Sequence, residues 1–213
     1  MFSVIFDMDG TLLDTQRICV PAWEYSGQQQ GFCGVGELVY NLCGANEPTW
    51  TKYLLDNYPL IEEVKFKKDV REYIAENGTV KYMNGAYELL EFFKNHNIKM
   101  AIASGSSKET IMHHLSEVGA THYFSAFVGG KDVENGKPAP DVFLKAAELL
   151  NAKPEDCFVF EDSPQGITAG FKAGMKCIGV PDIAKFSDEI KQMEYAELKS
   201  IDEAIEIFTK LLD

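Results

Sequence analysis

The sequence predicts an α/β protein: a doubly wound, parallel, five-stranded core of Rossmann-like topology that carries an all-helical insertion. Three observations favour this fold class. From residue 98 onward, short apolar runs alternate with helical stretches, as in parallel sheets covered on both faces. Between residues 15 and 78 there is no convincing strand. The length of 213 residues suits one core with a smaller insertion better than two domains of ordinary size.

Five apolar runs are the predicted strands of the core. They lack the polar alternation of a strand that faces water on one side, so we expect both faces of the sheet to be covered. The runs span residues 2–6, 98–103, 126–128, 157–160 and 177–180.

Helices are predicted between the later strands, over residues 107–118, 141–150 and 165–173. Pro140 suits the opening of the second of these helices, because proline is tolerated in a first turn. Gly174 suits the position just after the third, where the backbone often turns left-handed.

Residues 16–80 are the predicted all-helical insertion, so the core comprises residues 1–15 and 81–213. Phe66, Val70, Tyr73 and Ile74 recur at helical spacing within the insertion. Glycines and prolines divide it into several short helices.

The charge balance is acidic, with 33 acids against 20 bases and a net charge of −13. Generic nucleic-acid binders and proteins of anionic membrane surfaces need a basic face, so both classes are excluded. No apolar run approaches the roughly 20 residues of a membrane span. The N-terminus lacks the basic region of a signal peptide, and the five cysteines are widely spaced without a C-x-x-C pair. We therefore expect a cytoplasmic protein with reduced thiols.

Two carboxylates, Asp7 and Asp9, follow the first strand directly, and Gly10 allows a sharp turn after them. Two like charges at one site disfavour each other's ionisation unless a cation joins them. A calcium-binding loop is excluded, because glycine is fourth instead of sixth and Ile18 stands at the twelfth position. A plain structural turn remains the alternative for this segment alone.

Three more polar segments follow predicted strands or precede a predicted helix: Ser104-Gly105, Lys137 between two strands, and Glu161-Asp162. Ligands of open parallel sheets bind beyond the carboxyl ends of the strands, so we expect these side chains to converge. Glu161 and Asp162 should point to different sides, one binding a metal directly and the other supporting it. Oxygen ligands beside a phosphate cradle favour Mg²⁺. The histidines at 96, 113, 114 and 122 show no ligand spacing, so zinc is not indicated.

In their order along the chain, these segments resemble the four motifs of the haloacid dehalogenase superfamily. Asp7-Met8-Asp9-Gly10-Thr11-Leu12-Leu13-Asp14-Thr15 resembles the first motif, Ser104 the second, Lys137 the third and Glu161-Asp162 the fourth. The most similar subgroup contains β-phosphoglucomutase and small sugar-phosphate phosphatases, which carry a helical cap domain where residues 16–80 lie. The resemblance implies that this cap opens for substrate and closes to exclude water. We therefore expect a cleft between cap and core with Asp7 at its floor.

The resemblance also implies a Mg²⁺-dependent phosphohydrolase that cleaves a small sugar or polyol phosphate through an aspartyl-phosphate. Asp7 would be the nucleophile, Asp9 the general acid and base, and Ser104 and Lys137 would hold the phosphoryl oxygens. The partner is a small phosphorylated metabolite, and the protein is expected to be a monomer or a weak dimer. The implied phosphate-binding residues are Asp7, Met8, Asp9, Ser104, Gly105 and Lys137. The implied metal ligands are Asp7, Asp9 through its carbonyl, Glu161 and Asp162.

Departures from the subgroup's pattern favour hydrolysis over the mutase reaction, which is the second interpretation. By our alignment Cys19 replaces a histidine of the mutases, and Glu47 replaces a cap arginine that grips the distal phosphate. Cys43 stands where a cap lysine is often found. An acid at position 47 would repel a second phosphate.

Other readings fit the residues less well. Asp9 argues against true dehalogenases, which lack the second acid and the metal, and against phosphonatases, which carry another residue there. A catalytically silent binding module is the third interpretation, and the completeness of the four motifs argues against it.

Overall fold

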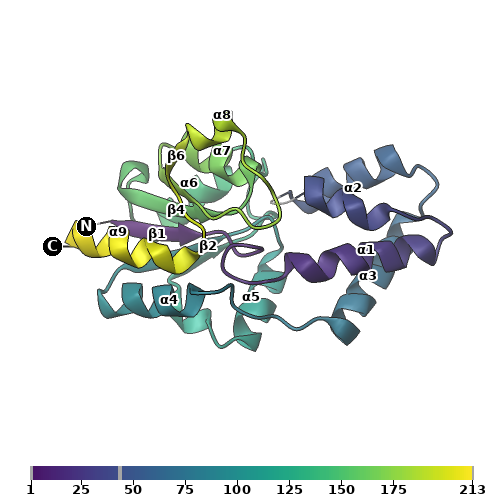
Figure 1. Ribbon diagram of the computed structural model, residues 1–213, viewed down its shortest axis with the longest axis horizontal. Coiled ribbons are helices and arrows are strands. Elements are labelled where there is room, and N and C mark those ends of the chain that lie inside the picture. The colour runs from purple at the N-terminus through teal and green to yellow at the C-terminus, as the bar shows by residue number, and fades with distance from the viewer. Residues whose placement is uncertain (1, 43–44, 213) are drawn as a thin grey trace.

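A six-stranded, wholly parallel sheet organises the core in a computed structural model that describes residues 2–42 and 45–212 (Figure 1). The strand order is β3-β2-β1-β4-β5-β6. The chain therefore builds outward from β1 in one direction and then in the other, so β1 and β4 flank the topological switch point. The strands are β1 (Ser3–Phe6), β2 (Lys99–Ala103), β3 (Ala126–Val128), β4 (Cys157–Glu161), β5 (Lys176–Gly179) and β6 (Glu194–Glu197).

The α/β fold class is confirmed, and all five predicted strands are present. The sheet has one more strand than predicted, β6. β6 pairs with β5 at the edge of the sheet, and its four residues are Glu-Tyr-Ala-Glu. An edge strand is hydrogen-bonded on one side only and can carry charged residues. It therefore lacks the continuous apolar run by which the buried strands were identified.

Helices cover both faces of the sheet, as the uninterrupted apolar strands predict. Successive side chains of β1 point to opposite faces, so Val4 and Phe6 belong to one hydrophobic cluster and Ile5 to another. The first cluster lies under α4 (Ala86–Asn95), α5 (Lys108–Glu117) and α9 (Ala204–Leu212). The second lies under α6 (Asp141–Leu150) and α7 (Pro164–Lys172).

Short polar side chains fix where the core helices begin. Ser107 accepts a hydrogen bond from the backbone N–H of Thr110 at the start of α5, and Ser163 does the same for Gly166 at the start of α7. Gly174 has a φ of 75° just after α7, as its sequence position predicts. The short helices of the structure are α8 (Asp188–Lys191), η1 (Val35–Asn41), η2 (Thr121–Tyr123), η3 (Pro154–Asp156) and η4 (Ile201–Glu203).

The segment after β1 forms a separate helical unit beside the sheet, built from α1 (Gln16–Gln28), η1, α2 (Glu47–Asn57) and α3 (Glu63–Asn77) (Figure 1). Within its described residues this unit contains no strand. The unit has its own apolar cluster, in which the Trp23 ring packs edge-on against Phe66 and near Trp50. The division of the chain into a core and a domain over residues 16–80 stays a prediction.

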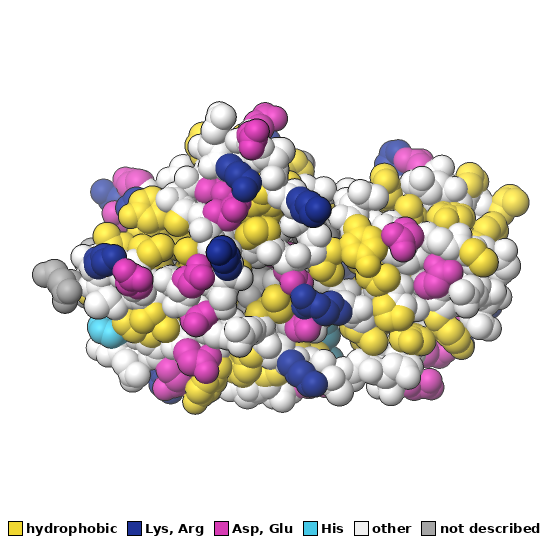
Figure 2. All heavy atoms as spheres, in the orientation of Figure 1, with side chains coloured by type: hydrophobic (Ala, Val, Ile, Leu, Met, Phe, Trp, Pro, Cys, Tyr) yellow, Lys and Arg dark blue, Asp and Glu magenta, His cyan; other side chains and the backbone are white. Residues whose placement is uncertain are grey.

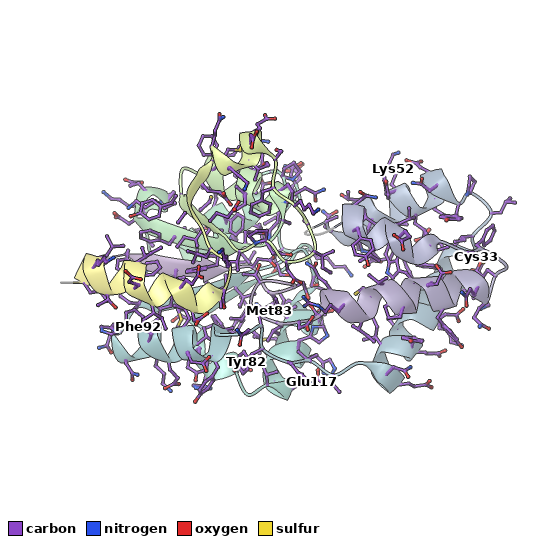
Figure 3. The ribbon with its side chains drawn as sticks, viewed as in Figure 1. Cys33, Lys52, Tyr82, Met83, Phe92 and Glu117 are labelled. Atoms are coloured by element: carbon purple, nitrogen blue, oxygen red, sulfur yellow. The ribbon has the colours of Figure 1, made fainter. Side chains whose placement is uncertain are left out.

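Two antiparallel chain crossings join the helical unit to the core. The backbone N–H of Asp14 donates to the Lys81 carbonyl, and that of Met83 donates to the Leu12 carbonyl, both at 2.9 Å. Tyr82, labelled with Met83 in Figure 3, donates its hydroxyl to the Val118 carbonyl beyond α5. The two crossings are thus hydrogen-bonded to each other and to the core. A motion that keeps these hydrogen bonds would involve the residues of the helical unit between the two crossings.

The surface agrees with an acidic protein of mixed charge. Figure 2 shows Lys and Arg side chains scattered among Asp and Glu on the face in view. Among residues 2–42 and 45–212, no helix is both long and apolar enough to cross a membrane. Cys19, Cys33, Cys157 and Cys177 are free thiols, and Cys33 is exposed near the far end of the helical unit (Figure 3).

Glu194 in β6 makes stability depend on pH. Its Oε1 atom is buried without a hydrogen-bond partner, and burial raises its pKa from 4.5 to about 7, with a further contribution from Glu197. A carboxyl with a raised folded-state pKa stabilises the protein at low pH. That stability is lost as the pH rises from about 4.5 through 7.

We predict that Glu194→Gln raises the melting temperature at pH 8 and that the gain shrinks as the pH falls toward 5. Because the side chain is only partly buried, the gain should be about 2–4 °C, the shift that ~1 kcal/mol gives in a chain of this size. Thermal unfolding followed by circular dichroism measures it, with the exposed Glu189→Gln as control. A gain that does not change with pH would contradict the assignment.

Candidate active site

The four polar segments meet at the carboxyl edge of the sheet, around the switch point between β1 and β4. Phe6 pairs with Phe160, so Asp7 and Glu161 lie side by side where these strands end. The Asp7 N–H donates to the Phe160 carbonyl at 2.9 Å. Ser104 follows β2, and Lys137 enters from the loop after β3. The parallel register thus brings together residues that lie up to 155 positions apart, as from Asp7 to Asp162.

Lys137 is the centre of this arrangement and is buried. Its Nζ lies 2.6 Å from Asp7 Oδ1, 2.6 Å from Glu161 Oε1 and 3.2 Å from the Ala103 carbonyl oxygen. An ammonium group has three N–H donors, so these contacts use all of them. Burial alone would lower the pKa of Lys137, but Asp7 and Glu161 raise it above its ordinary value. Lys137 is therefore held as a cation.

Glu161 is fixed from both sides and faces the core. While Oε1 accepts from Lys137, Oε2 accepts from the backbone N–H of Ser163 at 2.9 Å and from its hydroxyl at 2.8 Å. A Cβ at Gly166 would come within 1.8 Å of the Glu161 carboxylate, so only glycine fits in the first turn of α7 above it. Glu161 is positioned to hold Lys137.

Asp162 is also buried, and its partners come from the loop after β1. Its Oδ1 accepts from the Thr11 hydroxyl at 3.2 Å, and its Oδ2 accepts from Gln16 Nε2 at 3.0 Å. Burial raises the pKa of Asp162, and the neighbouring Glu161 and Asp7 raise it further. Burial is likewise the main cause that raises the pKa of Asp7, against the opposing charge of Lys137.

The Asp9 carboxylate is held by three hydroxyl groups. Oδ2 accepts from Ser104 at 3.0 Å and from Ser106 at 2.8 Å, and Oδ1 accepts from Thr15 at 2.6 Å. Ser104, which we expected to hold a phosphate, here donates to Asp9. The backbone carbonyl of Asp9 accepts from Gln16 Nε2 at 2.6 Å.

The two remaining sequence-predicted residues offer only backbone groups to a ligand. The Met8 side chain is fully buried in the hydrophobic cluster under α4 and α5. Gly105 has no side chain, and its carbonyl lies close to Gly130, where an added Cβ would approach it to 2.4 Å.

The carboxylates fit a divalent cation. One oxygen from each of Asp7, Glu161 and Asp162 lies within 4.8 Å of the others, and all three residues are buried. Lys137 pairs with two of these acids, Asp7 and Glu161, so the three carboxyl groups share one ammonium group within the cluster. Hard oxygen donors of this kind suit Mg²⁺.

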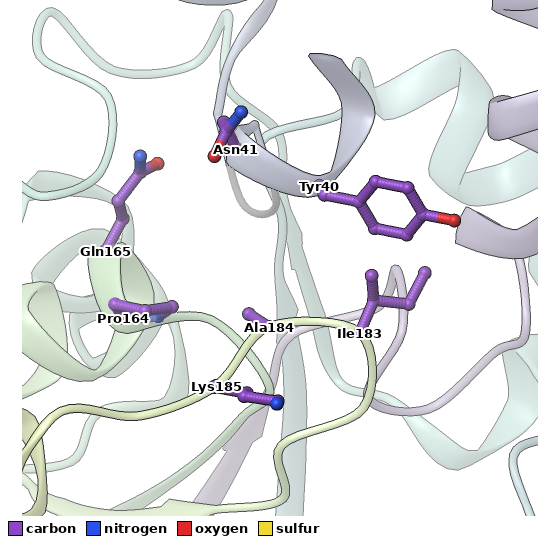
Figure 4. A pocket seen from close by; sticks show the side chains of 7 residues that line it. All are labelled: Tyr40, Asn41, Pro164, Gln165, Ile183, Ala184 and Lys185. Atoms are coloured by element: carbon purple, nitrogen blue, oxygen red, sulfur yellow. The ribbon is translucent and has the colours of Figure 1, made fainter. Parts of the chain in front are cut away.

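A cavity of about 340 Å³ lies between the helical unit and the core (Figure 4). Tyr40 and Asn41 face it from η1, opposite Gln165 at the start of α7. The other lining residues are Pro164, Ile183, Ala184 and Lys185. One lining residue, Pro164, stands two positions after Asp162 in the sequence.

The expectation that Asp7 lies at the floor of a cleft is wrong for this structure. Asp7 is only 2% exposed and does not line the cavity. The helical unit rests on the loop that carries Lys137: a Cβ at Gly136 would come within 2.1 Å of the Asn46 amide. The helical unit and the loop that carries Lys137 are therefore in close contact at this point.

The structure shows the contacts of Cys19 and Glu47, the two described residues at which the sequence departs from the mutase pattern. The Cys19 thiol donates to the Thr15 carbonyl at 3.4 Å. Glu47 was expected to present an unpaired charge, but its Oε1 accepts from Lys67 at 2.9 Å, and this hydrogen bond lowers its pKa. That expectation is corrected: α3 supplies a partner that the sequence could not show. Cys43 and Gly44 lie outside the described residues.

Sequence reasoning gave no role to five residues that hydrogen-bond to the site carboxylates, namely Thr11, Thr15, Gln16, Ser106 and Ser163. Each lies in a motif or within two residues of a motif position, and each is polar. That proximity is the only signal in the sequence, because polar residues at such places are also ordinary helix caps.

Comparison with known proteins gives the family. The model of the family described as haloacid dehalogenase-like hydrolase matches residues 4–180. A phosphorylated carbohydrates phosphatase of Thermotoga maritima is 33% identical over 181 residues, which cover 84% of this chain and 84% of that protein. The fructose-1-phosphate phosphatase of Escherichia coli is 31% identical over 190 residues, covering 84% and 95%.

Solved structures agree with these sequence matches. The β-phosphoglucomutase of Clostridium difficile superimposes with a TM-score of 0.81 at 25% identity, covering 99% of this chain and 96% of that one. A hydrolase of Pseudomonas syringae reaches a TM-score of 0.84 with 99% coverage of both chains; at 22% identity it supports the fold alone. The resemblance found in the four motifs is thereby confirmed: the chain belongs to the haloacid dehalogenase-like hydrolase family, and its relatives place it among the phosphatases of that family.

Proposed function

We propose that this protein is a Mg²⁺-dependent phosphatase that hydrolyses small sugar or polyol phosphates through an aspartyl-phosphate. The observation that carries the proposal is the burial of Asp7, Glu161 and Asp162 around the single ammonium group of Lys137. A phosphate ester cannot approach three carboxylates unless more positive charge is present. The Thermotoga and Escherichia relatives, a phosphorylated carbohydrates phosphatase and a fructose-1-phosphate phosphatase, support the substrate class.

Asp7 is the proposed nucleophile. Lys137 holds its Oδ1, which fixes the carboxylate at the end of β1 and leaves Oδ2 to attack phosphorus. As the new oxygen–phosphorus bond forms, the bond to the leaving oxygen breaks and the alcohol departs. The same ammonium group offsets charge on the phosphoryl oxygens. A rigid strand end thus provides both the attacking atom and its orientation.

Asp9 is the proposed general acid and base. It gives a proton to the leaving oxygen and later takes one from the water that attacks the aspartyl-phosphate, which releases inorganic phosphate and restores Asp7. Ser104 has one hydroxyl hydrogen, which it donates to Asp9 in this structure. It can donate to a phosphoryl oxygen only after releasing Asp9. Substrate binding would therefore remove one of the three hydroxyl donors that hold Asp9, while Thr15 and Ser106 keep the carboxylate in place.

The proposed metal ligands are the carboxylates of Asp7 and Asp162 and the carbonyl oxygen of Asp9. Both Glu161 oxygens are already engaged by Lys137 and Ser163, so Glu161 assists by positioning the cluster. The cation would supply charge neutralisation for the transferring phosphoryl group. The backbone groups of Met8 and Gly105 remain proposed phosphate contacts.

The cavity between the helical unit and the core is the proposed place for the leaving group. Its lining residues include Tyr40, the amide residues Asn41 and Gln165, and Lys185. Such groups bind hydroxyl-rich molecules by hydrogen bonding. The free thiols of the described cysteines are consistent with a cytoplasmic protein, which we propose as a monomer or weak dimer.

A mutase reaction is the second candidate, because β-phosphoglucomutases share the fold and Glu47 has basic neighbours. Two cations of the helical unit, Arg17 and Lys52, could bind a distal phosphate instead, but both are already engaged. Arg17 pairs with Asp14 and Asp182, and Lys52 pairs with Asp56. Hydrolysis therefore remains the favoured reaction.

We predict that Asp7→Asn lowers the turnover of a sugar phosphate by at least about 10⁴-fold, because an amide is nearly isosteric but a poor nucleophile. Released phosphate is the readout, and circular dichroism checks the fold. Asp56→Asn, on the exposed face of α2, is the control and should keep wild-type turnover. More than trace activity in pure Asp7→Asn protein would contradict the mechanism.

Metal removal should silence the enzyme. Excess chelator is expected to abolish phosphate release, and Mg²⁺ should restore it. Asp162→Ala should raise the Mg²⁺ concentration for half-maximal rate by about 10-fold or more, because one buried ligand is lost. Full activity in excess chelator would show that the chemistry needs no metal.

Hydrolysis and transfer can be measured in one reaction. With β-glucose 1-phosphate as substrate and a trace of glucose 1,6-bisphosphate present, we expect inorganic phosphate to accumulate with little glucose 6-phosphate. The distal phosphate of a bisphosphate would meet Glu47. The ammonium group of Lys67 already pairs with this acid and so does not bind the phosphate. Isomerisation that outruns phosphate release by a wide margin would reverse the order of the two candidates.

A further inference from the structure

Gln16 lies between the two strand ends that carry the proposed metal ligands. It is the first residue of α1 and is 7% exposed. Its Nε2 donates to the Asp9 carbonyl at 2.6 Å and to Asp162 Oδ2 at 3.0 Å. A Cβ at Gly10 would meet Gln16 Nε2 and Asp162 Oδ2 at the same distance of 2.5 Å, so the glycine turn closes directly over this contact.

The orientation of the Gln16 amide follows from its neighbours. The Asp9 carbonyl oxygen, 2.6 Å away, can only accept a hydrogen bond, so the amide group that faces it has to be the NH₂. That NH₂ carries the positive end of the amide dipole. Gln16 therefore presents partial positive charge to the Asp9 carbonyl and Asp162, the same oxygens that would bind the cation.

An amide NH₂ and a cation cannot use these oxygens in the same way. Mg²⁺ approaches its oxygen ligands to about 2.0–2.1 Å and tolerates little distortion of its octahedral geometry. Nε2 lies 2.6 Å from the Asp9 carbonyl oxygen and bridges it to Asp162. The lone pair of an amide NH₂ nitrogen is delocalised into its carbonyl group, so this nitrogen donates hydrogen bonds but does not bind a metal.

We propose that the Gln16 side chain competes with the divalent cation for Asp9 and Asp162 and is displaced when the cation binds. This inference rests on the metal site of the proposed function. Gln16 stabilises the carboxylate cluster by hydrogen bonds when no cation does so by charge. Metal affinity is then set partly by a residue that is not a ligand.

Displacement of Gln16 would act on the start of the helical unit. Its neighbour Thr15 holds the Asp9 carboxylate, and Arg17 joins Asp14 to Asp182 of the core. The first turn of α1 is thus fastened to the core by three consecutive side chains. Cation binding would release the middle one.

Direct binding of Mn²⁺, followed by electron paramagnetic resonance of the free ion, tests the competition without relying on activity. Gln16→Ala should bind Mn²⁺ roughly 10-fold more tightly than wild type, because two hydrogen bonds no longer have to break. In excess chelator the same variant should unfold at a lower temperature, since Asp162 and the Asp9 carbonyl lose their donor. Gln28→Ala is the control, because its amide donates to Glu24 within the exposed far end of α1.

Gln16→Glu gives a second measurement of the same competition. The carboxylate has nearly the shape of the amide but would face Asp162 with a like charge in chelator. It should therefore show the lowest melting temperature without metal and the largest gain on adding Mn²⁺. The expected order of that gain is Gln16→Glu, then Gln16→Ala, then wild type.

The outcomes separate the inference from the proposed function. If wild type binds Mn²⁺ and Gln16→Ala binds it equally or more weakly, Gln16 does not compete and only this inference fails. If wild type and both variants bind no Mn²⁺ at millimolar concentration, the metal site itself fails, and the inference fails with it.

Discussion

The Lys137 ammonium group, with all three of its N–H donors used by Asp7, Glu161 and the Ala103 carbonyl, sets the conditions for everything around it. A charge buried this deeply persists only when its donors are satisfied and its partners are charged. Removing either carboxylate would leave a buried cation incompletely paired. The loop after β3, the end of β2, the end of β1 and the end of β4 are thus held to one point.

The parallel sheet makes that point possible. The strand order reverses between β1 and β4, so the connections after these strands run to opposite sides of the sheet. Ligands of such sheets bind in the crevice that this reversal leaves at the carboxyl edge. Apolar strands run directly into carboxylates at this edge, which desolvates them and raises the pKa of both Asp7 and Asp162. The fold therefore buries more carboxyl groups than the Lys137 ammonium group can keep ionised. A bound cation would favour their charged forms, and this is the physical basis for the proposed cation and phosphate chemistry.

The helical unit is connected to the same charges. Its two crossings are paired with each other by hydrogen bonds, and its first turn reaches into the site through Thr15 and Gln16. It also contacts the loop before Lys137 through Asn46. The cavity beside α7 lies between this unit and the core.

The sequence by itself determined the fold class, five of the six strands and the four segments that converge, because buried parallel strands and the acids that end them are local, contiguous patterns. It could not reveal β6, whose charged residues are tolerated only at a sheet edge, or the partner of Glu47, which comes from another helix. Tertiary structure alone decided that Asp7 is buried and that Gln16 contacts Asp9 and Asp162. Such contacts depend on how separate elements pack, and no pattern of neighbouring residues records the distance between them.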